Sequence, residues 1–429
     1  MEHAGLSVRP VGDLTHKRQA ADNGNMETIP ELPRIRPGLA VSPEETSLSR
    51  FILWDQLRIS HEPQPLSLIE LEILKRMDGR HTVRDLQLAA MQALGGILIP
   101  LEDVTALVRR LDEHLYLDSP RFDAYLGGPI REPACIGTYD ANPSKLREQM
   151  RWLFTQPGGP GLPTNPGQDN GLRAALLPHM DYTRGNITYA WGFKEVFEHT
   201  NASLFVIIAT SHYSPHRFTL TRKHFKTPLG IVETDQEFID RLEKHYGEGL
   251  FDDLYCHFPE HSVELEVVVL HYLYENVRPF RIVPLVVGSF SDCIESGDAP
   301  GEQEDIRRMV EALRKAEAET PEPVCYIISG DLAHIGPKFG DRQPVAEPLL
   351  SWSEQQDRAL IQSLEAVDPQ RYFHIIASER DARRICGLPP TWTLLDAIRP
   401  NRGKLLHYGR YRHPTGHESV SFASVGFYR

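Results

Sequence analysis

The stretch SLFVIIATSHYSPH, residues 203–216, decides the fold that this sequence predicts. Residues 204–209 form an unbroken apolar run rich in β-branched side chains, which is typical of a strand buried on both faces of a sheet. The run stops at Thr210, Ser211 and His212. A core strand that ends in a histidine indicates that this end of the strand opens into a site.

Length, composition and charge narrow the class of protein. The chain has 429 residues, 41% of them hydrophobic and 24% charged, which is ordinary for a globular protein with two or three domains. The net charge of −13 argues against general binding to nucleic acid or to anionic membranes. We find no apolar run of the roughly 18 to 20 residues that a membrane-spanning helix needs. The N-terminus lacks the apolar segment of a secretory signal, so we expect a cytoplasmic protein.

The cysteines and histidines bear on metal chemistry. The five cysteines are scattered and contain no Cys-x-x-Cys pair, so we expect neither a disulfide framework nor a structural zinc knuckle. The 19 histidines leave room for metal or acid–base chemistry without demonstrating it.

The N-terminal part divides into a leader and a small domain. Residues 1–49 hold few large apolar side chains, and we expect a flexible leader. Residues 50–126 predict three helices with flanking strands, the first two helices capped by Ser67 and Thr82, which favours a winged-helix-like domain. Its 9 Lys and Arg against 12 Asp and Glu between residues 50 and 124 argue against DNA binding.

One segment of this domain, LEILKRMDGRHTVRDLQ, resembles the peptide-binding winged helices found beside peptide-modifying enzymes. The resemblance implies that the domain binds a peptide or a partner. A purely structural appendage is the alternative.

From residue 130 to 429 the chain alternates strand-like and helix-like segments, which predicts an α/β domain with helices covering a largely buried sheet. The predicted strands are 172–177, 204–209, 281–287, 324–329 and 419–428, and the predicted helices are 185–197, 235–246, 262–274, 304–318 and 354–365.

Polar residues stand next to four of these segments. They are His179 after the first strand, His212 after the second, Asp331 and His334 after the fourth, and Glu260 with His261 before the helix at 262–274. In open α/β sheets ligands bind beyond the carboxyl ends of the strands. We therefore expect these side chains to converge on one site.

Each residue also has a purely structural interpretation. A histidine after a strand is often a hydrogen-bonded loop residue, and Glu260 suits the first turn of a helix. Asp331 is compatible with a helix cap that has His334 one turn along, and Cys386 with a small buried hydrophobe. The repeated occurrence of His and Asp after successive core segments favours a functional site. The spacing of these residues alone leaves metal binding and acid–base chemistry both open.

A set of motifs in a fixed order resembles the Memo family, which includes the proteins called AmmeMemoRadiSam system protein B. The motifs are REPACIGTYDANPSKLREQM, PHMDYTRG, IIATSHYSP, TPLGIVETDQEFIDRL, EHSVELEVVVLHYL, IVPLVVG, ISGDLAHIGPKFG and CGLPP, spread over residues 131–428. The resemblance implies a three-layer α/β domain, similar to the class III extradiol ring-cleaving dioxygenases, behind the small winged-helix-like domain.

The resemblance also implies a site. His179, His212 and Cys386 match the family's metal-ligand set, while His261, Asp331 and His334 would line the same pocket as candidate catalytic residues.

The sequence departs from the family pattern at the rim of this pocket. Met180 and Asp181 replace the common Ala-Gly after the first histidine, Tyr213 replaces a second histidine, and the Leu after Cys386-Gly387 replaces an Arg. These changes bear on the identity of the ligand more than on the fold.

The ligand set favours particular metals. Ring-cleaving dioxygenases hold Fe(II) with two histidines and a carboxylate, whereas two imidazoles and a thiolate form a softer site that suits copper or zinc. We expect copper or iron, with zinc as a further candidate. At a helix N-terminus His261 would remain neutral and accept a proton, and Asp331 would orient His334.

Two functions follow from the resemblance. The first is a metal-dependent redox protein that acts on an unknown small molecule, with a radical-SAM protein as a candidate partner. The second is a non-enzymatic protein that binds a peptide, a phosphopeptide or a partner in a vestigial pocket, because animal relatives are associated with receptor tyrosine kinase signalling.

Overall fold

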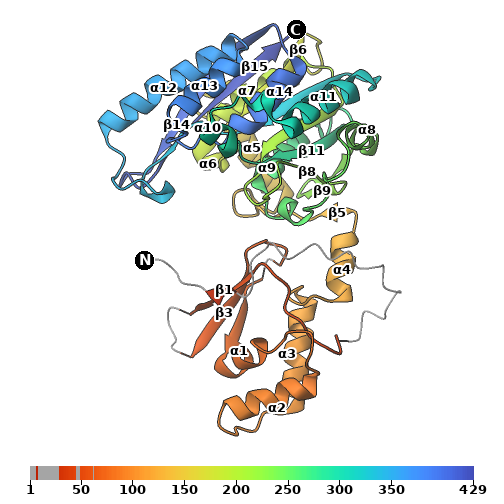
Figure 1. The fold of residues 1–429 in the computed structure, drawn as a ribbon. Helices are drawn as coiled ribbons and strands as arrows, with labels where there is room; N and C mark the ends of the chain where they lie inside the picture. Colours follow the sequence, from red (N-terminus) through yellow and green to blue (C-terminus); the bar gives the residue numbers. More distant parts are fainter. Residues whose placement is uncertain (1–5, 8–28, 45–48, 61) are drawn as a thin grey trace. The chain divides into compact units, whose positions relative to one another are not determined.

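A computed structural model describes residues 6–7, 29–44, 49–60 and 62–429 of the chain. The chain folds as two compact units, Met1–Pro129 and Ile130–Arg429 (Figure 1). Within the described residues, every helix is too short or too polar to cross a lipid bilayer.

The smaller unit combines a four-stranded antiparallel sheet with helices. The sheet has the order β1 (Leu6–Ser7), β2 (Leu39–Pro43), β3 (Arg50–Asp55), β4 (Gln64–Ser67), and the helices are α1 (Leu68–Leu74), α2 (Val83–Ala93), α3 (Leu101–Glu113) and α4 (Pro120–Gly127). Ser67 and Thr82 cap α1 and α2 as predicted, each in a capping box with an acidic residue three positions later. The winged-helix assignment itself stays a prediction.

The expected leader is wrong for residues 29–44. Strand β2 pairs with β3 in antiparallel register, and Leu39 and Ala40 are buried. Arg36 is buried as well and donates a hydrogen bond to Asp55 (2.5 Å), so this stretch belongs to the core of the smaller unit. Of the remainder of the expected leader, the short strand β1 and Ser49 are described and the other residues lie outside the described part of the chain.

The larger unit is built on a mixed sheet. Five neighbouring strands are parallel, in the order β6 (Leu172–Leu177), β12 (Val324–Ser329), β7 (Leu204–Thr210), β11 (Arg281–Val287) and β10 (Gly230–Thr234). The antiparallel β15 (Ser419–Tyr428) pairs with β6, and β14 (Arg402–Arg412) and β13 (His334–Ile335) pair with β15. Shorter strands at the other margin are β8 (Phe218–Leu220), β9 (His224–Thr227) and β5 (Ile130–Arg131).

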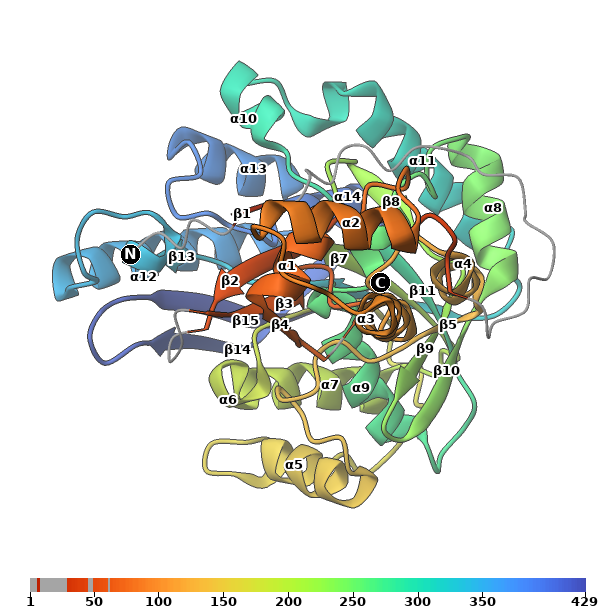
Figure 2. The same ribbon diagram turned by 90° about the horizontal axis from the view of Figure 1, so that it is seen from below.

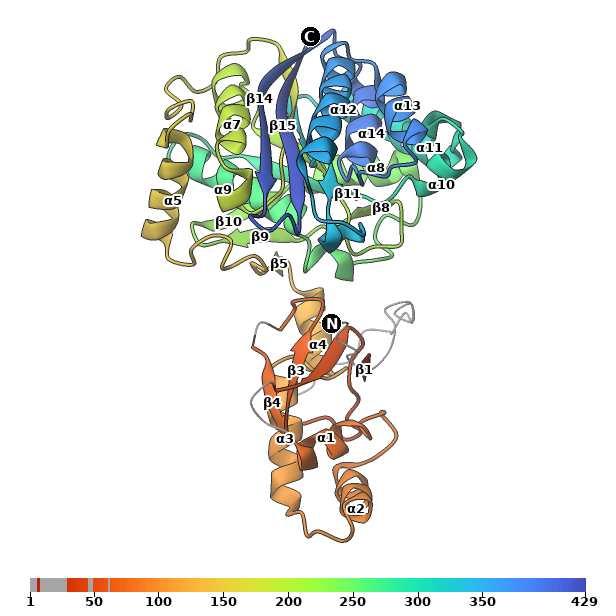
Figure 3. The same cartoon turned by 90° about the vertical axis from the view of Figure 1, so that its left-hand side faces the viewer.

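Helices cover both faces of this sheet, which confirms the predicted three-layer α/β fold. One face carries α5 (Pro143–Thr155), α7 (Ile187–His199) and α9 (His261–Tyr274), and the other carries α8 (Gln236–Tyr246), α11 (Glu304–Ala318), α12 (Glu347–Glu365), α13 (Pro369–Ser378) and α14 (Leu388–Ile398) (Figures 2 and 3). The side chains of strand β7 show why both faces of the sheet are covered. Leu204, Val206 and Ile208 join the core cluster on one face, while Phe205, Ile207 and Ala209 join the cluster on the other.

Candidate functional site

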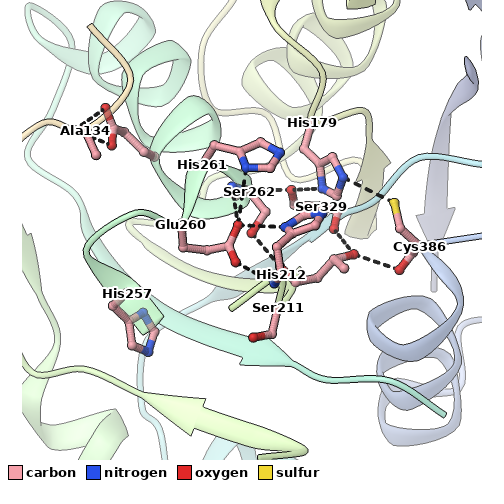
Figure 4. A network of polar contacts seen from close by, with 12 residues as sticks. Ala134, His179, Ser211, His212, His257, Glu260, His261, Ser262, Ser329 and Cys386 are labelled. Carbon is pink, nitrogen blue, oxygen red and sulfur yellow. Dashed lines mark hydrogen bonds and ion pairs between the residues drawn. The ribbon is translucent and has the colours of Figure 1, made fainter. Parts of the chain in front are cut away.

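The site lies where parallel strands end. Strands β6, β12 and β7 are parallel neighbours, so their carboxyl ends meet at one edge of the sheet. His179 lies two residues beyond β6, His212 two residues beyond β7, and Asp331 two residues beyond β12. Helix α9 begins at His261 next to them (Figure 4). This geometry is the one that the strand pattern predicted.

Three imidazoles face one another at this edge. The ring centroids of His212 and His261 are 4.5 Å apart and nearly stacked, and each ring is 5.1 to 5.2 Å from that of His179. The side chains of His212 and His261 are 31% and 32% exposed, whereas that of His179 is only 2% exposed. His212 and His261 therefore form the outer side of the site, and His179 forms its inner wall.

Glu260 joins two of these histidines. As the N-cap of α9, its carboxylate accepts a hydrogen bond from the Ser262 amide (3.1 Å). It also accepts from the His212 amide (2.8 Å) and from Nδ1 of the same residue (2.9 Å), and it lies 3.5 Å from Nδ1 of His261. Nδ1 of His212 is thereby engaged, which leaves Nε2 of that ring for a ligand.

Glu260 and His212 each stabilise the charged form of the other. Burial by itself raises the pKa of Glu260, but His212 and His261 outweigh it and hold that pKa well below the usual range. Burial by itself lowers the pKa of His212, but the carboxylate of Glu260 outweighs it and raises that pKa. Glu260 is therefore a buried anion that depends on its histidine neighbours.

His179 and Asp331 form the inner wall. Oδ1 of Asp331 accepts a hydrogen bond from the His179 amide (3.2 Å), and Oδ2 lies 3.6 Å from Nε2 of His179. Burial raises the pKa of Asp331 to about 7. Burial, followed by the charges of His212 and His261, lowers the pKa of His179 well below its ordinary value, so this imidazole is neutral.

His334 is oriented differently from the sequence-based hypothesis. Its Nδ1–H donates to the carbonyl oxygens of Arg384 (3.0 Å) and Leu332 (3.2 Å), not to Asp331, whose carboxylate is directed at His179. Backbone carbonyls therefore fix the ring of His334. No helix follows β12 in residues 330–336, all of them described, so the reading of Asp331 as a helix cap is also wrong.

Cys386 reaches the site on the loop before α14. Its Sγ lies 3.2 Å from Nε2 of His179, and its carbonyl accepts a hydrogen bond from Oγ1 of Thr210 (2.8 Å). Two glycines allow this close approach, because a Cβ on Gly330 would lie 2.5 Å from Cα of Gly387. Burial, together with the charge of Asp331, raises the pKa of the Cys386 thiol well above its ordinary value.

A buried ion pair holds the segment that carries Glu260. Arg131 forms an ion pair with Glu264 of α9, and both side chains are fully buried. The same guanidinium donates to the carbonyls of Phe258 (2.9 Å) and Glu260 (3.0 Å). The backbone of Glu260 is thus fixed from a residue far away in sequence.

Donor atoms for a metal ion lie close together here. Three sets each have ligand atoms within 4.8 Å of one another, namely His179, His212 and Cys386; His212, Glu260 and His261; and Asp331, His334 and Cys386. Two imidazoles and a thiolate match the donor preferences of copper and zinc, so these residues fit a metal ion.

The six residues predicted as metal ligands or catalytic residues come together at this edge of the sheet with Glu260, while their individual roles stay predictions. Sequence reasoning missed the shared acceptor role of Glu260 and the supporting roles of Arg131 and Glu264. The sequence feature that could have indicated this role of Glu260 is its position immediately before an apolar helix. The Arg-x-Pro of REPACIGTYD contained Arg131 but gave no clue to its partner.

Comparison with known proteins agrees with this geometry. The profile of the Memo-like protein family matches residues 131–427, which begin at the start of the larger unit. A MEMO1 family protein of Aquifex aeolicus is 26% identical over 392 residues, covering 88% of this chain and 96% of the relative. A MEMO1 family protein of Methanopyrus kandleri is 29% identical over 309 residues, covering 70% of this chain and 99% of the relative.

Proposed function

This chain belongs to the Memo-like protein family, and we propose that it holds a copper or iron ion through His179, His212 and Cys386 for redox chemistry on a small molecule. The observation that carries the proposal is the convergence of two imidazoles and one thiol, from three separated segments, with donor atoms within 4.8 Å of one another. Zinc suits the same donors and is the third candidate.

The arrangement around the three donors supports a metal ligand set. The carboxylate of Glu260 engages Nδ1 of His212, which is how ligating histidines are commonly oriented. Nε2 of His179 already faces the sulfur of Cys386 at 3.2 Å. A bound copper or iron ion would supply one-electron redox chemistry at this edge of the sheet.

Side chains next to the donors are suited to move protons. His261 is partly exposed at the start of α9 with Nδ1 3.5 Å from the carboxylate of Glu260, so its ring can exchange a proton with a substrate at the outer side of the site. Asp331, with a pKa near 7 caused by burial, is suited to hold a proton beside His179. His334, fixed by two carbonyls, would present its Nε2 to a ligand.

Metal content measured by mass spectrometry tests the proposal. We expect about one copper, iron or zinc ion per anaerobically purified chain, and loss of that ion in His212→Ala and in Cys386→Ser. The matched control is His199→Ala, because His199 is partly exposed at the end of α7 and faces Glu195, outside the site. Absence of metal from the native chain, or equal metal in all variants, would contradict the proposal and leave a metal-free binding pocket as the alternative.

A further inference from the structure

The smaller unit contains a groove that is independent of the proposed metal site. It has a volume of about 400 Å³ and lies between α1 and the start of α3. Ile73, Ile99 and Leu107 form its apolar floor, and the charged side chains of Glu70, Asp103 and Arg110 stand among its lining residues. This volume is at the lower end of the range for ligand pockets, which suits a few side chains rather than a folded domain.

Exposed apolar residues occur in the lining of the groove and next to its lining residues in the sequence. Leu98, which lines it, is 81% exposed, and the adjacent Ile97 and Leu68 are 51% and 47% exposed. Of the thirteen large hydrophobic residues that are exposed in the described part of the chain, seven belong to the smaller unit, which has fewer than a third of the residues. An exposed leucine in the lining, on a unit rich in exposed apolar residues, favours a binding surface at this groove.

The charge of the lining residues is unbalanced. Arg110 forms an ion pair with Glu70 at 2.8 Å, which neutralises both. Asp103 and its neighbour Glu102, in the exposed first turn of α3, have no ion-pair partner among the described residues. The groove therefore combines an apolar floor with excess negative charge at one end, and an occupant that complements both features is apolar and positively charged.

We propose that this groove binds a short segment of a partner polypeptide, in which two or three apolar side chains are accompanied by a lysine or an arginine. The apolar side chains fill the space above Ile73 and Leu107, and the cation lies beside Asp103. Grooves between helices commonly receive peptide segments in this manner, with apolar anchors supplying affinity and the charge supplying specificity.

A selection with the full chain tests the proposal. The probe is a display library of randomised twelve-residue peptides, selected against the native chain and counter-selected against Ala106→Arg. Ala106 is exposed and lines the groove, so the arginine occupies the groove and neutralises the acidic end without disturbing the core. Ala93→Arg is the matched control, because Ala93 is an exposed helical residue outside the groove.

We expect enriched peptides with an apolar pair or triplet next to Lys or Arg. Their affinity should fall at least about 10-fold in Ala106→Arg, about 1.5- to 5-fold in Asp103→Asn, and not in Ala93→Arg. Three results would overturn the proposal: no enriched peptide sensitive to Ala106→Arg, an acidic consensus, or a native dimer that becomes a monomer in Ala106→Arg, which would make the groove a contact between copies. Unchanged metal content in Ala106→Arg would keep this test separate from that of the metal site.

Discussion

Replacement of Glu260 by Gln tests the architecture of the site most directly. The carboxylate accepts hydrogen bonds from the backbone amide and Nδ1 of His212 and from the backbone amide of Ser262, at 2.8 to 3.1 Å. A carboxamide has a single acceptor oxygen. Whichever way it is turned, its NH₂ group faces a hydrogen-bond donor at the second oxygen position. Either the backbone amide or Nδ1 of His212 therefore loses its acceptor, and the buried negative charge is lost in both orientations.

The size of the effect follows from that loss. Loss of a partner that orients a ligating histidine typically weakens metal binding about 10- to 100-fold, equal to about 1.4 to 2.8 kcal/mol. The assay is a competitive titration of the metal-free protein against a chelator of known affinity. We expect Glu260→Asp to weaken binding as well, because the shorter carboxylate keeps the charge but fails to reach Nδ1 of His212.

Glu264→Gln is the matched control for Glu260→Gln. It changes a second buried carboxylate one turn further along α9, whose partners are Arg131, Tyr139 and backbone amides rather than the histidines. We expect Glu264→Gln to lower the melting temperature, because it weakens a buried ion pair, and to weaken metal binding less than Glu260→Gln does. Native metal affinity in Glu260→Gln combined with weakened binding in Glu264→Gln would refute the reasoning.

Three further outcomes are expected. Burial lowers the pKa of His257 to about 4, so its imidazole binds a proton more tightly in the unfolded chain than in the folded one. The free energy of unfolding therefore falls by up to about 3 kcal/mol as the pH drops from 6.5 towards 4. His257→Leu should flatten the fall of the melting temperature across that window, and an unchanged slope would contradict this. Gly330→Ala places a Cβ against Gly387 and displaces the loop that carries Cys386, so we expect loss of metal content with an unchanged circular dichroism spectrum. Retained metal would contradict this and show that the loop moves without disturbing the site. Asp55→Ala leaves Arg36 buried without its carboxylate, at a cost of about 3 to 5 kcal/mol, and urea titration should show the smaller unit unfolding first.

The sequence predicted strands that are buried on both faces of the sheet and a helix that has one clear apolar side. The limits of β11, β12 and β15 agree with the apolar runs, and α11 agrees with its periodic pattern. Strand β14 was not predicted, because its sequence RGKLLHYGRYR is only half-buried and rich in charge. Helix α14 was not predicted either, because Pro389 and Pro390 in its first turn resemble a loop although proline is tolerated there.

The site could be predicted as a set of residues but not as a network. Strand ends and motif order pointed to His179, His212 and Cys386. The contact from Glu260 to His212 spans 48 positions and the contact from Arg131 to Glu264 spans 133, and no local pattern encodes such pairs. The orientation of His334 was missed for a similar reason, because a backbone carbonyl 50 positions away determines it.

The separation between His179 and Cys386 has a consequence for biosynthesis. These two side chains meet across 207 positions, and β15, which pairs with β6, follows Cys386 in the sequence. At about 5 to 20 residues per second, a ribosome needs about 10 to 40 s to translate the interval between them. During that time the nascent polypeptide exposes histidines without their sulfur partner. A metal ion that needs both side chains would therefore be captured only after Cys386 has left the ribosome.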